Sequence, residues 1–415
     1  MKNIYTSVDM GSDTIKVVVC ELHKNRLNLL AASSVRSRGI KKGVITDVTK
    51  ASESLKEALS EVELMLGVKI KRVIASVPSY FAEYTYAEGK IDIKSEDKIV
   101  SGDDIIRCLH NAVKTKIGVN NELVTVIPID FSLNDEQLIK DPKGLQGENL
   151  SSRMILVTTP KKNIYSVVSL IESIGVIVED ISLNNIGDIY AFKNSKTETQ
   201  LGVVINIGSE TTSVSLYNKD IVVKSAIIGL GGNDVDNDIS YMYKINRDQA
   251  LKIKERFALA HKLYASVNDF YEVSTKNNEI ISINQFEVSE VVMSRLEEIL
   301  TFAIKEINNL TNKKIQYIII TGGMSNMAHF KYIVDEVLGK RAIIGNIKVI
   351  GARDNSYSSA IGNIVYFIDK LKLRNKQYSM FSKEDVEELS TTKKNLINIS
   401  NDSMLGKVFG YFWSE

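Results

Sequence analysis

The spacing of apolar residues along the chain switches repeatedly between a strand pattern and a helix pattern. Short apolar runs bounded by turn residues predict strands at 4–8, 15–22, 27–35, 72–77, 202–205, 212–217, 221–228 and 317–320. Apolar residues three or four positions apart predict helices that begin after Asp47 and end at Gly67, and others near 292–310 and 358–371. Strands that alternate with helices predict an α/β fold with helices on the sheet faces.

One unit of this pattern occurs twice. Residues 9–14 read Asp-Met-Gly-Ser-Asp-Thr and residues 206–211 read Asn-Ile-Gly-Ser-Glu-Thr, each between two predicted strands. A long-period repeat of one supersecondary unit predicts two related halves that face each other.

Composition limits the classes of function. The chain has 415 residues, which favours at least two domains, and its 52 Lys and Arg nearly balance 51 Asp and Glu. This balance disfavours a nucleic-acid partner. Two cysteines and four scattered histidines disfavour a disulfide framework and a metal site. No apolar stretch approaches the roughly 20 residues that span a bilayer, so we expect a cytoplasmic protein that can still lie on a membrane.

Glycine-containing turns provide the candidate chemistry. A turn with Gly and Ser or Thr can direct backbone N–H groups and hydroxyls at an anion, although a single one is usually an ordinary hairpin turn. Here two matching turns are accompanied by Gly231-Gly232 and by Thr321-Gly322-Gly323. Together they favour a nucleotide cleft between the two halves.

The order of these motifs resembles the actin and heat-shock-chaperone ATPase superfamily. Within it, the chain resembles the FtsA family over nearly its whole length. The segments 78–91, 103–105, 127–128 and 141–147 resemble the 1C subdomain that distinguishes FtsA from other actin-like families. Residues 229–239 resemble the connecting motif of the family, and 357–362 resemble the start of its last core helix.

The resemblance implies a two-domain actin-like fold with duplicated halves around the cleft. Residues 1–81 and 162–195 would form domain I, 82–161 the 1C subdomain, and 196–373 domain II, with subdomain IIB at about 234–316 and the last helix returning toward domain I. A flexible polar linker at 374–402 and an amphipathic helix at 403–415 would follow.

The resemblance also implies a site for ATP and Mg²⁺. The phosphates, the ribose and the base would be held by Asp9, Gly11, Ser12, Asp13, Thr14, Lys16, Asn206, Gly208, Ser209, Thr211, Thr212, Gly231, Gly232, Asn233, Lys254, Gly322, Gly323 and Met324. Asp9 would hold Mg²⁺ through water, and Gly322, Gly323, Met324 and Lys254 would lie near the nucleoside.

Three positions depart from the family pattern. Asn206 replaces an Asp, Leu183-Asn184-Asn185 lacks an acid expected near the attacking water, and Leu251 replaces a Glu. Phosphoryl transfer depends on positioning and on stabilising charge. We therefore expect no catalytic residues and at most weak ATPase activity, rather than an enzyme.

The C-terminal end is amphipathic. As a helix, residues 403–415 place Met404, Leu405, Val408, Phe409, Phe412 and Trp413 on one face. After a polar linker, such a face fits an interfacial membrane helix, with docking on the chain itself or on a partner as the alternatives.

The resemblance implies an ATP-binding adaptor of cell division at the cytoplasmic face of the membrane at the septum. Its partners would be the FtsZ C-terminal tail, further copies of itself in a head-to-tail filament, membrane lipids and other division proteins. The alternatives are a pilus-assembly-type adaptor of the same fold and a chaperone-like ATPase with real turnover.

Overall fold

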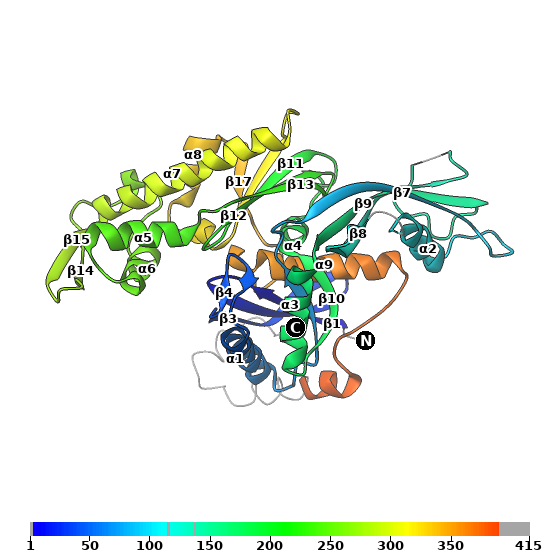
Figure 1. Cartoon of the computed structure of the whole chain (residues 1–415), viewed down its shortest axis with the longest axis horizontal. Coiled ribbons are helices and arrows are strands. Elements are labelled where there is room, and N and C mark those ends of the chain that lie inside the picture. Colours follow the sequence, from blue (N-terminus) through cyan, green and yellow to red (C-terminus); the bar gives the residue numbers. More distant parts are fainter. Residues whose placement is uncertain (1–2, 114–116, 137, 390–415) are drawn as a thin grey trace, which may run out of the picture.

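Two five-stranded sheets with the same strand order form the centre of the molecule (Figure 1). The computed structural model describes residues 3–113, 117–136 and 138–389. The first sheet has the order β10-β6-β1-β2-β3 and the second the order β17-β16-β11-β12-β13. Their strands are β1 (Asn3–Met10), β2 (Thr14–His23), β3 (Arg26–Arg36), β6 (Arg72–Val77), β10 (Ile177–Leu183), β11 (Leu201–Ile207), β12 (Thr212–Asn218), β13 (Ile221–Ile228), β16 (Tyr317–Thr321) and β17 (Ala342–Ile344).

The strand pairing is also the same in the two sheets. β1 runs antiparallel to β2 and parallel to β6, and β11 runs antiparallel to β12 and parallel to β16. The duplication predicted from the two turns is therefore confirmed, and the molecule has a mixed α/β fold with two related domains.

Helices cover the sheets as the apolar pattern predicts. α1 (Val48–Leu66) begins where the Asp47 side chain accepts a hydrogen bond from the Lys50 backbone N–H, and it ends at Gly67, which has a φ of 75°. Together with α3 (Lys161–Ser173), α1 covers one face of the first sheet, whereas α9 (Ser358–Leu373) lies on β1, β2 and β6. α7 (Gln285–Leu310) and α8 (Phe330–Leu338) pack beside the second sheet. Within the described ranges, no helix is both long and apolar enough to span a bilayer.

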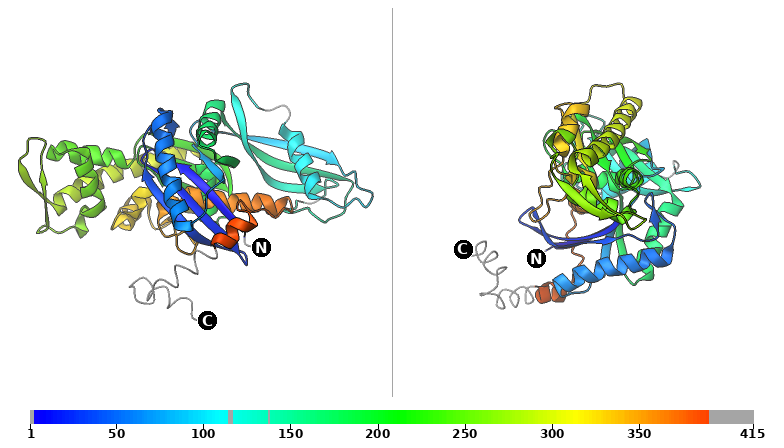
Figure 2. Two further views of the ribbon diagram at one scale, coloured as in Figure 1. Left: turned by 90° about the horizontal axis from the view of Figure 1, so that it is seen from below. Right: turned by 90° about the vertical axis from the view of Figure 1, so that its left-hand side faces the viewer.

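The two ends of the long axis carry different additions (Figure 2). One end has α5 (Gly232–Tyr243), α6 (Arg247–Arg256) and the hairpin of β14 (Phe270–Ser274) and β15 (Ile280–Asn284), which share a core with the second sheet. The other end has a three-stranded sheet of β7 (Glu83–Asp92), β9 (Asn149–Pro160) and β8 (Asn121–Leu133), with α2 (Gly102–Val113) packed on it.

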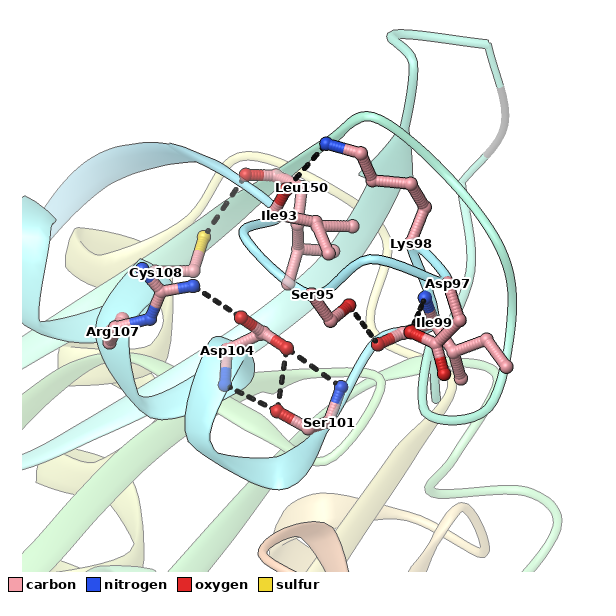
Figure 3. A network of polar contacts seen from close by, with 10 residues as sticks. All are labelled: Ile93, Ser95, Asp97, Lys98, Ile99, Ser101, Asp104, Arg107, Cys108 and Leu150. Carbon is pink, nitrogen blue, oxygen red and sulfur yellow. Dashed lines mark hydrogen bonds and ion pairs between the residues drawn. The ribbon is translucent and has the colours of Figure 1, made fainter.

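A polar network surrounds the start of α2, and in it the Cys108 thiol reaches the Leu150 carbonyl of the three-stranded sheet (Figure 3). Ser101 caps the helix, because its Oγ accepts from the Asp104 N–H at 3.2 Å while Asp104 Oδ2 accepts from the Ser101 N–H at 2.9 Å. One turn on, the buried Cys108 thiol lies 3.3 Å from the Gly89 carbonyl oxygen. A Cβ at Gly89 would lie 2.3 Å from the Cys108 carbonyl oxygen, so glycine allows this close approach.

The predicted linker at 374–402 is wrong over its first half. Residues 383–389 are helical, and Met380, Phe381 and Leu389 are buried in the core of the first sheet. The Met380 N–H donates to the Ile4 carbonyl at 2.9 Å, and Lys71 pairs with Asp385 at 3.0 Å. A few apolar side chains anchor this segment although they form no sustained period. The predicted amphipathic helix with its six apolar residues lies outside the described residues.

Two helices cross between the sheets, α9 and α4 (Asn184–Ala191), and both have a glycine at the crossing. A Cβ at Gly362 would lie 1.7 Å from the Gly187 carbonyl oxygen, and a Cβ at Gly187 would lie 2.2 Å from the Ser359 carbonyl oxygen. Any larger residue at these two positions would force the helices apart.

Replacing Gly362 by alanine is therefore expected to destabilise the fold. Overpacking typically costs about 1–3 kcal/mol, which outweighs the helix propensity of about 1 kcal/mol that alanine gains over glycine. Thermal unfolding followed by circular dichroism should show a melting temperature several degrees lower. The control is Gly118→Ala, an exposed position where the nearest atom to an added Cβ lies at 3.9 Å. An unchanged melting temperature in Gly362→Ala would contradict this account of the crossing.

Candidate nucleotide cleft

The two repeated turns have the same internal geometry. The Gly11 N–H donates to the Thr14 carbonyl at 3.1 Å, and the Gly208 N–H donates to the Thr211 carbonyl at 3.0 Å. Each turn connects the first two strands of its sheet, so both are held rigidly at the strand ends. They therefore form two equivalent backbone turns, one from each domain.

Both turns line one cavity of about 470 Å³. The cavity brings together every residue of the predicted nucleotide site except two, from five separate segments of the chain. These lining residues are Asp9, Gly11, Ser12, Asp13, Thr14, Lys16, Asn206, Gly208, Ser209, Thr211, Gly232, Asn233, Lys254, Gly322, Gly323 and Met324.

The two exceptions support the cavity from behind. The buried Thr212 hydroxyl donates to the Leu230 carbonyl at 2.9 Å, so it braces the segment before α5. Gly231 packs on the second turn, since a Cβ there would lie 2.6 Å from the Gly208 carbonyl oxygen. The start of α5 is thereby tied to the turn, where the Gly232 N–H also donates to the Gly208 carbonyl at 2.9 Å.

The other glycines leave room at the cavity wall that a side chain would fill. Gly322 has a φ of 92°, which L side chains rarely adopt, and a Cβ there would lie 2.4 Å from Asn206 Oδ1. A Cβ at Gly232 would lie 2.8 Å from the Met324 sulfur. Gly323, in contrast, has no neighbour within 4 Å of an added Cβ, so it leaves open space at the cavity wall.

Charges of both signs surround the cavity. Burial raises the pKa of Asp9, and the Lys16 ammonium opposes that rise. Lys16 Nζ donates to Thr14 Oγ1 at 2.6 Å, and Lys254 Nζ lies 2.8 Å from Asp236 Oδ1 in a buried pair. Lys16, Lys42 and Lys254 all reach the lining, so cationic groups are available to an anionic ligand.

A buried carboxylate that the sequence analysis did not identify lies directly behind Asn206. Asp188 on α4 is 1% exposed, and its Oδ2 accepts from Asn206 Nδ2 at 2.7 Å. Its Oδ1 accepts from the Ser358 and Ser359 hydroxyls at 2.7 and 2.8 Å. Burial raises the pKa of Asp188 to about 6, although these three hydrogen bonds lower it. Its isolated position in a short helix gave no signal in the sequence.

The positions that depart from the family pattern also lie at the cavity. Asn184 Oδ1 accepts from the backbone N–H groups of Ser79 and Asn185 at 3.1 and 2.8 Å, so this side chain fixes the start of α4. Leu251 lines the cavity, and Glu255, one turn further along α6, lines it too. Residues four positions apart share one face of a helix, so the sequence could have indicated that Glu255 lies beside Leu251 at the cavity.

The lining fits a nucleotide with its cation. The Ser79 hydroxyl is buried at the cavity and has no hydrogen-bond partner among the described residues. It can therefore donate a hydrogen bond to a polar ligand or accept one from it. Glycine turns, three lysines and the carboxylate of Asp9 are the groups that phosphates and hydrated Mg²⁺ require.

A larger hollow of about 1070 Å³ lies elsewhere, between the three-stranded sheet, the β12–β13 turn and the end of α9. Neither of the repeated turns reaches it. The smaller cavity is therefore the candidate nucleotide site.

Solved structures with the same fold cover almost the whole chain. A PilM-PilN type IV pilus biogenesis complex covers 89% of this chain and 98% of its own, with a TM-score of 0.59 and 13% identity. MreB5 of Spiroplasma citri bound to ADP covers 90% of this chain and 99% of its own, with a TM-score of 0.53 and 13% identity. At such identity these likenesses establish the actin-like fold alone.

Sequence comparisons identify the family. Residues 203–362 match the family model of the cell division protein FtsA, and residues 82–158 match the SHS2 domain inserted in FtsA. FtsA of Bacillus subtilis is 25% identical over 94% of this chain and 89% of its own length. FtsA of Borreliella burgdorferi is 28% identical over 88% of this chain and 91% of its own length. The two matches to separate parts and the relatives over nearly the whole length agree, and the chain is a divergent member of the FtsA family of cell division proteins.

Proposed function

We propose that this chain is an ATP-binding adaptor that polymerises on the cytoplasmic membrane and tethers FtsZ filaments at the division septum. The observation that carries the proposal is the pair of equivalent glycine turns that line one cavity together with Gly232, Gly322 and Gly323. Membership of the FtsA family supplies the context of cell division.

In this proposal the cavity holds ATP between the two domains. The backbone N–H groups and hydroxyls of the two turns grip the phosphates, and Lys16 balances their charge. Asp9 holds Mg²⁺ through water, because Mg²⁺ in nucleotide sites usually keeps several of its waters. The nucleoside lies against Gly322, Gly323 and Met324, with Lys254 beside it. Bound ATP would supply the negative charge that draws the two turns together.

The same cavity is poorly equipped for hydrolysis. Asn184 and Asn206 are neutral amides, which cannot accept a proton from water at neutral pH. The acceptor oxygen of Asn184 is also already used by two backbone N–H groups. We therefore propose that ATP acts as a switch or structural ligand, with little or no turnover.

Membrane and partner contacts would come from other parts of the chain. The apolar face of residues 404–413 would insert into the bilayer surface, and copies would join head to tail through the 1C and actin-like faces. The FtsZ tail would dock on the subdomain between Asn233 and Gln316. Leu263 there is 76% exposed, and the exposed Tyr264 stacks on Tyr332 with ring centroids 3.9 Å apart, which suits an apolar peptide.

The two alternatives make different demands. A pilus-assembly-type adaptor shares this fold but takes a different peptide partner, so failure to bind FtsZ would favour it. A chaperone-like ATPase needs steady turnover, so measured hydrolysis would favour that class.

Isothermal titration calorimetry with Mg·ATP tests the cleft. Asp9→Ala should weaken binding at least about tenfold, because the Mg²⁺ water shell loses its carboxylate. Asp248→Ala removes an exposed acid that lies outside the cavity and should leave affinity unchanged. A wild-type chain without affinity for ATP at millimolar concentration would refute the nucleotide proposal.

A phosphate-release assay tests the slow turnover. We expect the wild-type chain to release phosphate no faster than a protein-free sample over hours. The reason is that the neutral amides of Asn184 and Asn206 cannot act as a general base. Steady release that disappears in Asp9→Ala would show real hydrolysis in this cleft and would favour the chaperone-like class.

Co-sedimentation with liposomes tests the tether. The full chain should pellet with vesicles and bring added FtsZ with it, whereas a chain that ends at Ser403 should stay in the supernatant. The single lysine of residues 403–415 predicts weak dependence on anionic lipid, because apolar insertion then dominates. If truncation leaves sedimentation unchanged, the tail is not the membrane anchor.

A further inference from the structure

The two phosphate-facing turns differ in one chemically important position. Repeat alignment places Asn206 opposite Asp9, so one turn begins after a carboxylate and the other after a neutral amide. Both side chains line the same cavity. The asymmetry would leave position 206 without the carboxylate that Asp9 brings to a hydrated cation in the first turn.

The missing carboxylate has a neighbour that can replace it. Asp188 Oδ2 accepts from Asn206 Nδ2 at 2.7 Å, and the carboxylate is buried just behind this amide, on α4 rather than on β11. Burial is the main cause of the raised pKa of Asp188, and the Asp9 charge adds to it.

The hydrogen bond also determines how the Asn206 amide is oriented. An ionised carboxylate only accepts hydrogen bonds, so the amide must turn its NH₂ group toward Asp188. Asn206 Oδ1 then points the other way, toward the Gly322 backbone at the cavity wall, where a Cβ would lie 2.4 Å from it. An oxygen in this position can accept from water bound to Mg²⁺.

Serine hydroxyls hold Asp188 in place. Ser358 and Ser359, the first residues of α9, both donate to Oδ1, and Thr321 Oγ1 lies 3.0 Å from Ser358 Oγ. Since Oδ1 is occupied in this way, Oδ2 is left for Asn206. The arrangement therefore fixes the carboxylate, and the carboxylate fixes the amide.

We propose that Asp188 is a positioning residue of the nucleotide site, which acts with Asn206 as one charged unit and supplies, behind position 206, the carboxylate that Asp9 provides in the first turn. The inference rests on the proposed binding of ATP with Mg²⁺. Asp188 touches neither ligand; it orients Asn206 Oδ1 toward the hydrated cation and places a negative charge one hydrogen bond behind it.

An exchange of the two side chains tests this role. The quantity to measure is the magnesium enhancement, defined as the ratio of ATP affinities in Mg²⁺ and in EDTA, by calorimetry on the full chain. Asp188→Asn should reduce the enhancement at least about tenfold. The double variant Asp188→Asn/Asn206→Asp keeps the same atoms and a mutual hydrogen bond, and it should restore most of the enhancement. Asp220→Asn, a buried acid outside the cavity, is the matched control and should behave as wild type.

The outcomes separate this inference from the proposed function. If wild type binds Mg·ATP and Asp9→Ala weakens binding, but Asp188→Asn keeps the full enhancement, the inference fails and the nucleotide site remains. If Asp188→Asn does not fold, the double variant decides alone: folded protein without magnesium enhancement overturns the inference, and folded protein with it supports the role. A wild-type chain that binds no ATP overturns both proposals.

Discussion

The close crossing of α4 and α9 is the constraint on which the rest of the structure depends. Gly187 and Gly362 let the two helix backbones touch, so the two sheets are held at one separation and the cleft has a fixed floor. Residues near the crossing also make polar contacts, because Asp188 follows Gly187 and accepts from the Ser358 and Ser359 hydroxyls at the start of α9. The steric requirement and the polar network thus occupy the same few positions.

Features held by contacts between residues close in the sequence were predictable, and features held by contacts between distant residues were not. The paired turns and α1 were predictable because their signals are local: Gly11 and Thr14 close one turn, and Asp47 and Gly67 bound one helix. The role of Asp188 was not predictable, because its serine partners are separated from it by about 170 residues and its helix is too short to show a period. The prediction of a linker around Met380 was wrong for the same reason, because the partners of this segment lie near the N-terminus.

The family relationship survives at about 25% identity because the fold requires few specific side chains. Steric demands fall on glycines such as Gly322 and Gly362, where added atoms would collide with backbone. The sheet interiors require only apolar residues of suitable size, and many combinations satisfy that requirement. Divergence can therefore alter charged positions of the cleft while the two domains keep their arrangement.

The position of Asp188 has an electrostatic rationale. Two carboxylates facing each other in the cleft would repel in the absence of a cation. The free energy needed to keep both of them ionised would then be higher. A neutral amide at Asn206 separates the buried acid from the cavity, and two hydroxyls and the amide satisfy its oxygens. The carboxylate keeps hydrogen bonds whether or not a cation is present, since its partners come from the protein. The buried charge is therefore stabilised by the protein itself, and the cleft does not need a bound cation to keep its structure.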